Sequence, residues 1–188
     1  MQLAAELKFE ADEIIDFWLA NEGKWFAKDA AFDKIISAKY QDLYTYMVAN
    51  NDWRLLATQP NNVLALILLF DQFPRNMFRD TPKMYATDAK ALELTLLAIE
   101  QEFDLRLQFK NMQMFLYMPL MHSEDLKYQN LCVKLFQGLD DAANALKFAI
   151  MHRDIIANFG RFPHRNKILG RQSTADELEF LQKPGSSF

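Results

Sequence analysis

Residues 29–51, DAAFDKIISAKYQDLYTYMVANN, carry the clearest structural pattern in this chain. The repeating apolar positions are Phe32, Ile35, Ile36, Tyr40, Leu43 and Met47. Their spacings of three and four residues predict one amphipathic α-helix, because residues at those spacings share a helix face. Asp29 precedes the pattern and is expected to cap the N-terminus of the helix.

A second stretch, PNNVLALILLFDQF at residues 60–73, is apolar on nearly every side of the helix that it would form. That pattern is typical of a helix buried in the protein interior. Thr81 and Pro82 predict the start of a long helix, since proline is favoured at the first helical position. Residues 110–118 predict a short helix that ends at Pro119.

Three later helices are expected from their capping residues. Ser123 is placed to cap the first of them, and Asp140 or Asp141 is placed to open the second. Thr174 and Glu177 have the spacing of a capping box, in which each residue bonds the backbone of the other. They predict a last short helix.

The composition supports the same fold class. Only 5 Gly and 6 Pro occur in 188 residues, of which 51% are hydrophobic. Sandwiches, barrels and doubly wound sheets need many tight turns, so scarce turn residues argue against them. We therefore predict an all-α protein of about seven to nine helices without a sheet, folded as a single domain over residues 1–188.

Charge and cysteine content narrow the range of partners. The net charge of −4 provides no general basic surface for nucleic acid or an acidic membrane. Cys132 is the only cysteine, so an internal disulfide is excluded, and it is expected to be a small buried side chain. The N-terminal sequence lacks the pattern of a signal peptide. A soluble cytoplasmic protein without a cofactor is the expectation.

Two segments resemble each other. FPRNMFRDTP begins at Phe73 and FPHRNKILGRQST begins at Phe162, and each follows a strongly apolar stretch. Equivalent joints in a repeated helix pair need equivalent turn chemistry, so the likeness favours a helix-pair repeat.

Arginines are concentrated in two segments, 71–79 and 152–171. Arginine is preferred over lysine where a planar fork meets carboxylates in fixed geometry. The structural interpretation is a set of buried ion pairs that join helix ends, and the functional interpretation is an anion site. Candidate carboxylate partners are Asp71, Asp80, Glu124, Asp125 and Asp154.

All three histidines lie in or near the same segments. His152 shares a helix face with Phe148, Ile155 and Phe159, which predicts a hydrogen-bonded core histidine. His164 lies between Pro163 and Arg165, where exposure is expected.

Catalytic and metal-binding signatures are weak. No metal-ligand spacing, nucleophile motif or glycine-rich phosphate loop occurs, and neighbouring arginines would repel a cation. The sequence therefore predicts no metal site. Acid–base catalysis by His122 or His164 remains an open alternative, so enzymatic activity is left undecided, with a binding role preferred.

Several long motifs resemble one family. They are FDQFPRN at 70–76, YMPLMHSED at 117–125, HRDII at 152–156, FGRFPHRN at 159–166 and PGSSF at 184–188. Together they are similar to the bacterial domain-of-unknown-function family 924, with Phe70 in place of a leucine. The resemblance covers nearly the whole chain from Asp16 onward. It implies antiparallel helix pairs in a right-handed superhelix like that of tetratricopeptide repeats, and it implies no known reaction, substrate or cofactor.

The preferred functional hypothesis is a binding or scaffold module for an anionic small molecule or a peptide. Its candidate binding residues are Asp71, Arg75, Asn76, Arg79, His122, Glu124, His152, Arg161, His164 and Arg165. Arg75 and Arg165 are expected to line one depression. The alternatives are a small-molecule hydrolase or isomerase using His122 or His164, and a purely structural ion-pair cluster in an oligomerising protein. The oligomeric state is left open.

Overall fold

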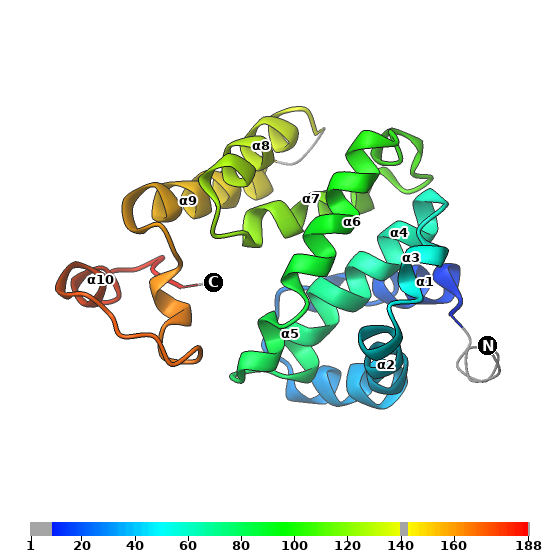
Figure 1. Cartoon of the computed structure of the whole chain (residues 1–188), viewed down its shortest axis with the longest axis horizontal. Helices are drawn as coiled ribbons and strands as arrows, with labels where there is room; N and C mark the ends of the chain where they lie inside the picture. The colour runs from blue at the N-terminus through cyan, green and yellow to red at the C-terminus, as the bar shows by residue number, and fades with distance from the viewer. Residues whose placement is uncertain (1–8, 140–142, 188) are drawn as a thin grey trace. The chain divides into compact units, whose positions relative to one another are not determined.

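The computed structural model describes residues 9–139 and 143–187, and every regular element within them is helical (Figure 1). The all-α class is therefore confirmed for this part of the chain. Helices α4 and α5 are joined without a break by the helical segment at Leu68–Gln72, so they are counted as one helix. The described residues then contain nine helices, which is within the predicted range of seven to nine.

The chain divides into two compact units. Unit 1 comprises Met1–Arg79 and Lys83–Pro119, and unit 2 comprises Asp80–Pro82 and Leu120–Phe188. The helices of unit 1 are α1 (Ala11–Leu19), α2 (Ala30–Asn50), α3 (Trp53–Leu56), α4 (Pro60–Ile67), α5 (Phe73–Met77) and α6 (Asp88–Glu100). Those of unit 2 are α8 (Leu126–Gln137), α9 (Ala143–Phe159) and α10 (Ala175–Phe180). The division falls inside α7 (Gln113–His122), after Pro119.

Short non-α helical segments connect these helices. The 3-10 segments are η2 (Glu22–Lys24), η4 (Pro82–Tyr85), η5 (Asp104–Arg106), η6 (Lys110–Met112) and η7 (Pro163–Arg165). A π-helical segment, η3 (Leu68–Gln72), joins α4 to α5.

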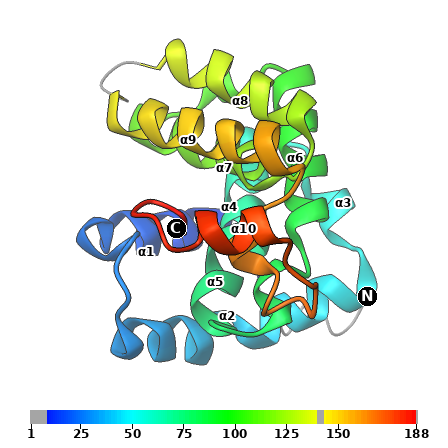
Figure 2. The ribbon, with the colours of Figure 1, turned by 90° about the vertical axis from the view of Figure 1, so that its left-hand side faces the viewer.

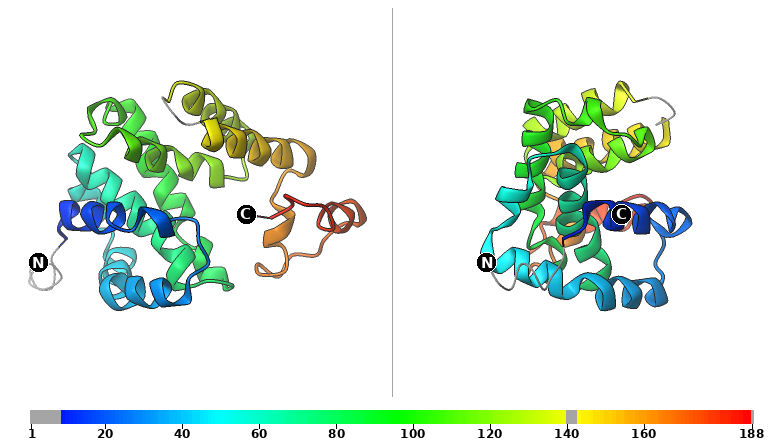
Figure 3. Two further views of the ribbon diagram at one scale, coloured as in Figure 1. Left: turned by 180° about the vertical axis from the view of Figure 1, so that it is seen from behind. Right: turned by 90° about the vertical axis from the view of Figure 1, so that its right-hand side faces the viewer.

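The core of unit 1 is built around α4. Every residue from Val63 to Phe70 is buried, as its apolar pattern predicts. Helices α1 and α6 contact α4, and α2 contacts α5 (Figure 3). The amphipathic α2 begins at Ala30 with Asp29 as its N-cap, because the Asp29 carboxylate accepts hydrogen bonds from two backbone N–H groups.

The π-helical segment η3 lies just before Pro74, which changes the hydrogen bonding of the backbone there. Pro74 has no N–H, so it cannot donate an α-helical hydrogen bond to the carbonyl of Phe70. The Thr87 hydroxyl donates to that carbonyl instead, at 2.6 Å. π-Helical turns inside α-helices occur frequently at functional sites, and this one places Asp71 and Gln72 in the buried interior.

Unit 2 is organised around the helix pair α8 and α9, which lie side by side (Figure 2). Asp125 caps α8, accepting a hydrogen bond from Lys127 N–H. The predicted capping box at Thr174 and Glu177 is confirmed as the start of α10. Cys132 on α8 is buried, as expected.

Three predicted helix ends are wrong. The long helix α6 begins at Asp88, because the residues after Thr81 form the separate 3-10 segment η4. Pro119 lies inside α7 rather than ending it. Ser123 does not cap α8. Its hydroxyl accepts a hydrogen bond from the N–H of Asp125, and Asp125 is the residue that caps the helix. The expected start at Asp140 or Asp141 lies outside the described residues.

None of the helices within residues 9–139 and 143–187 combines the length and apolar character needed to cross a membrane. The single-domain organisation, the helix-pair repeat and the superhelical arrangement stay predictions.

Candidate functional site

The predicted site residues fall into two groups. Asp71, Arg75, Asn76 and Arg79 belong to unit 1, and the other six belong to unit 2. Each group forms contacts within its own unit, as described below. The single depression expected to contain both Arg75 and Arg165 stays a prediction.

In unit 1, Arg75 is held between two carboxylates. Its guanidinium donates two hydrogen bonds to Asp88, at 3.0 and 3.1 Å, and lies 3.2 Å from Asp71 Oδ1. Asp71 is fully buried, and the ring of Tyr85 lies near the guanidinium. Burial alone would lower the pKa of Arg75, but the charges of Asp71 and Asp88 outweigh it and raise that pKa. Arg75 is therefore a charged group engaged internally.

Asn76 and Arg79 share one partner on α2. Arg79 donates two hydrogen bonds to Asp33, both 2.8 Å long, and Asn76 donates a third of the same length. Burial opposes ionisation of Asp33, yet these hydrogen bonds lower its pKa. The network ties the end of the α5 region to the first turn of α2, which is a structural role.

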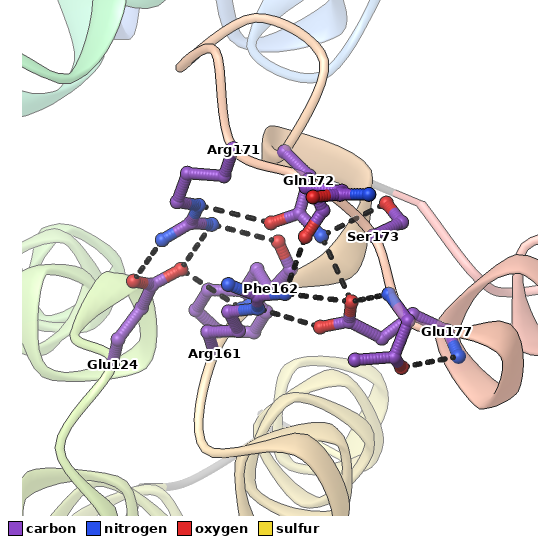
Figure 4. A network of polar contacts seen from close by, with 9 residues as sticks. Glu124, Arg161, Phe162, Arg171, Gln172, Ser173 and Glu177 are labelled. Carbon is purple, nitrogen blue, oxygen red and sulfur yellow. Dashed lines mark hydrogen bonds and ion pairs between the residues drawn. The ribbon is translucent and has the colours of Figure 1, made fainter.

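In unit 2, Glu124 and Arg171 form a bidentate ion pair with nitrogen–oxygen distances of 2.7 and 2.9 Å (Figure 4). Glu124 also accepts from the backbone N–H of Phe162 at 2.8 Å, and Arg171 donates to the carbonyl of Phe162 at 3.1 Å. Burial raises the pKa of Glu124, but Arg171 and the Phe162 N–H together lower it below its ordinary value. Both backbone polar groups of Phe162 are thereby held by side chains.

A second ion pair continues this network. Arg161 donates two hydrogen bonds to Glu177, at 2.6 and 2.8 Å, and a third to the carbonyl of Gln172 (Figure 4). Asn166 donates to Glu177 and to Ser173, while its oxygen accepts from Arg171. The hydrogen bond from Arg161 is the main cause that lowers the pKa of Glu177, to about 2. The network joins the segment after α9 to α10.

Phe162 is the centre of a third group, which we name the Phe162 cluster: His122, His152, His164 and Arg165. The ring of His152 meets the Phe162 ring edge-on, with 5.5 Å between centroids, and the His164 ring lies 5.5 Å away. Arg165 places its guanidinium carbon 4.4 Å from the centre of the Phe162 ring. His122 lies 6.4 Å from His152 between ring centroids. Two imidazoles and one guanidinium therefore contact a single aromatic ring, and a third imidazole lies beside His152.

Two of these imidazoles are neutral at neutral pH. Burial, the neighbouring His122 and the charge of Arg165 lower the pKa of His152 to about 3. Burial and Arg165 lower the pKa of His164 to about 4. The Nδ1 atom of His152 lies 2.8 Å from the carbonyl of Phe148. Because a carbonyl only accepts, Nδ1 must carry the proton of the neutral ring.

Some sequence expectations for this region need correction. His164 is half-buried in η7 rather than exposed, because it packs beside Phe162. His152 is buried and hydrogen-bonded, as predicted, but Phe148 on the same helix is 48% exposed. Among the described residues, no group of three or more His, Cys, Asp or Glu side chains is placed to hold a metal ion.

The carboxylate partners of the arginines were predicted in part. Asp71, Glu124 and Asp154 are confirmed, with Arg75, Arg171 and Arg153 as their respective partners. Asp80 and Asp125 form no ion pair with an arginine in the part of the chain that the structure describes: Asp80 has a left-handed backbone, with φ 60°, and Asp125 caps α8.

Sequence reasoning missed three partners: Asp33, Asp88 and Glu177. The available signal was that all three are acidic residues in the first turns of α2, α6 and α10. That signal did not identify them as arginine partners, because a favourable interaction with the helix dipole explains acidic residues there equally well.

Comparison with known proteins gives a family but no activity. A family model described as a bacterial protein of unknown function, DUF924, matches residues 14–185. The solved structure of a protein of unknown function from Agrobacterium tumefaciens is 40% identical, with a TM-score of 0.86. The match covers 95% of this chain and 98% of that one. No curated protein matches significantly.

Proposed function

The chain belongs to DUF924, a family of bacterial proteins of unknown function, and we propose from its own geometry that it is a binding module for a small anionic molecule. The ligand would be held in unit 2 by the Phe162 cluster. The observation that carries this proposal is the gathering of two imidazoles and a guanidinium around one aromatic ring, with the His122 imidazole beside that of His152.

The local charge favours an anion. Arg165, Glu124, Arg171 and His122 act electrostatically on His164, so this set has two guanidinium groups and one carboxylate. Burial and Arg165 keep His152 and His164 neutral, so these rings offer hydrogen bonds without adding charge. Arginine is suited to this role because its planar fork matches carboxylate and phosphate groups.

The ion pairs beside the cluster would serve as its support. Glu124 and Arg171 hold both backbone polar groups of Phe162, and Arg161 with Glu177 fixes the following segment. Such support keeps the ligand-contacting groups in place before the ligand arrives, which lowers the entropic cost of binding. In this interpretation Glu124 and Arg161 position the site, and His122, His164 and Arg165 contact the ligand.

The structural alternative has its own observation. Arg75, Arg79, Arg161 and Arg171 each form a bidentate pair with an internal carboxylate. We assign these four arginines to holding helix ends together.

The catalytic alternative is weakened for one residue. With a pKa of about 4, His164 is a neutral imidazole at neutral pH, so no imidazolium is present there to act as a general acid. Catalysis by His122 stays a prediction.

A thermal-shift titration tests the binding proposal. The probes are inorganic phosphate, pyrophosphate and succinate, added as sodium salts at fixed ionic strength. At least one should raise the midpoint of unfolding of the full chain in a saturable way, since a ligand that binds the folded state stabilises it. Arg165→Met should weaken that binding by roughly tenfold or more, because one desolvated charge-assisted contact is lost.

Lys183→Ala is the matched control, because Lys183 belongs to an exposed ion pair on the end of α10. It removes a positive charge from the same unit and should leave the titration unchanged. If no probe raises the midpoint, or if Arg165→Met responds as strongly as the wild type, the anion site is wrong.

A further inference from the structure

We infer that Gln129 is a positioning residue for the Phe162 cluster, which fixes His122 by holding the backbone on both sides of it. Gln129 lies on α8, and its side chain is fully buried. Its amide nitrogen Nε2 donates to the carbonyl of Met121 at 2.7 Å and to the carbonyl of Ser123 at 2.6 Å. Those two residues flank His122 in the sequence, and all of them belong to unit 2.

The partners of the Gln129 amide determine its orientation. A carbonyl oxygen only accepts hydrogen bonds, so both contacts require the amide nitrogen, which carries two hydrogens. Turning the amide over would set its oxygen against two carbonyl oxygens, which repel it. Gln129 is therefore restricted to one orientation, in which both of its hydrogens hold the backbone beside His122.

His122 needs this support because it is the last residue of α7. The last four carbonyls of an α-helix have no partner within the helix, and the Met121 carbonyl is one of them. Gln129 satisfies it, and the N–H of Ser123 donates to the carbonyl of Leu120 at 3.3 Å. The peptide groups before and after His122 are thus both held by hydrogen bonds, which fixes the direction in which its side chain leaves the backbone.

That direction places the His122 ring beside the ring of His152, at 6.4 Å between centroids. The His152 ring in turn meets Phe162 edge-on. Because Gln129 is fully buried, it acts on the cluster through His122 rather than by contact with a ligand. The consequence for binding rests on the proposed function, in which His122 contacts the anion and a ring held in place beforehand binds it more tightly.

A glutamine that only stabilised the fold would behave differently, and the chain offers a matched control. Gln113 is the first residue of α7, is also buried, and donates to the hydroxyl of Tyr117 at 3.1 Å in unit 1. Gln113→Met and Gln129→Met each remove one buried amide of similar volume. Both should lower the midpoint of thermal unfolding, and only Gln129→Met should displace His122.

NMR of the full chain tests the positioning without any ligand. In the wild type, both Nε2 protons of Gln129 should exchange slowly with solvent, and the ring protons of His122 and His152 should show an NOE. In Gln129→Met that NOE should disappear and the ring signals of His122 should shift. In Gln113→Met the NOE and the signals should be those of the wild type. Circular dichroism establishes that each variant is folded.

Anion titration of the same proteins tests the consequence, with inorganic phosphate, pyrophosphate and succinate as the probes. Gln129→Met should weaken binding about two- to tenfold, the cost of immobilising one side chain on binding. His122→Ala should also weaken it, and adding Gln129→Met to His122→Ala should weaken it no further. A residue that acts through another has no effect once that other side chain is gone. Gln113→Met should leave the affinity unchanged.

Fast exchange of the Gln129 amide protons in the wild type would overturn the inference, and this measurement needs no variant to fold. An unchanged His122 signal and NOE in folded Gln129→Met would overturn it too. So would an anion affinity that Gln129→Met leaves unchanged, or lowers equally in the His122→Ala background. If no anion binds the wild type, the proposed function is wrong, and the NMR result still decides whether Gln129 positions His122.

Discussion

Glu124 and Arg171 are 47 residues apart in the sequence, and their side chains meet with 2.7 Å between Glu124 Oε2 and Arg171 Nη1. This pair also holds the backbone of Phe162, whose ring contacts His152 and His164. A contact between the start of α8 and the segment before α10 therefore determines where the Phe162 cluster forms.

Glu124→Gln should destabilise the protein and disturb the Phe162 cluster. The amide cannot accept two hydrogen bonds from Arg171 and a third from Phe162 in the same way, and the guanidinium loses its counter-charge. We expect a loss of about 1–3 kcal/mol in the free energy of unfolding, measured by urea denaturation. Glu179→Gln, in an exposed pair with Lys183, should leave the unfolding curve unchanged. Equal effects of the two substitutions would contradict this role of Glu124.

Arg75→Met should be more damaging, because it leaves the fully buried Asp71 without its nearest positive charge. Removing one member of a buried ion pair costs about 3–5 kcal/mol. The double variant Arg75→Met with Asp71→Asn should recover part of that loss, since no buried charge then remains at position 71. The measurement is again urea unfolding. A double variant no more stable than Arg75→Met would show that Asp71 is held by other groups.

Stability should fall as the pH drops below the ordinary histidine pKa of about 6.5. His152 and His164 have folded-state pKa values of about 3 and 4, so the unfolded chain binds more protons between those values and 6.5. Their contribution is fully present above pH 6.5 and is lost progressively toward pH 4. Each histidine should add a slope of up to about 1.4 kcal/mol per pH unit.

Unfolding measured from pH 7 to pH 5 checks this dependence. His152→Phe should flatten the slope, because the phenylalanine keeps an aromatic ring against Phe162 and binds no proton. Glu177 has a lowered pKa of about 2, so its contribution to the stability of the protein is lost only as the pH falls below the ordinary glutamate pKa. That range lies below the pH 7 to pH 5 window. A slope that is the same in His152→Phe and in the wild type would refute the assignment.

Cys132 should be unreactive in the folded protein. It is fully buried on α8, and burial raises the pKa of its thiol to about 12, so almost no thiolate is present at neutral pH. An aromatic disulfide reagent should modify it rapidly in denaturant and only slowly without it. Rapid modification of the native protein would mean that α8 opens readily from α9.

The helical fold follows from local patterns. The apolar spacing that includes Phe32 and Tyr40 involves residues three or four positions apart. Asp29 and Thr174 each cap a helix through residues two or three positions further on. Both kinds of pattern can therefore be recognised in the sequence. The error at Thr81 arises where a tertiary contact competes with local preference, whereas at Ser123 the competitor is local, because Asp125 two residues later caps α8. The Thr87 hydroxyl, for example, donates to the carbonyl of Phe70, to which Pro74 cannot donate because it has no N–H. Helix α6 begins at the next residue, Asp88.

The sequence by itself determined the class of fold and the set of unusual polar residues, because hydrophobic periodicity and arginine placement are properties of neighbouring positions. Only the tertiary structure decided which carboxylate each arginine meets. It paired Arg79 with Asp33 and Arg161 with Glu177. It also placed His152 and His164 against Phe162, with His122 beside His152. Those choices depend on which helix ends become neighbours in space, and packing between distant segments determines this.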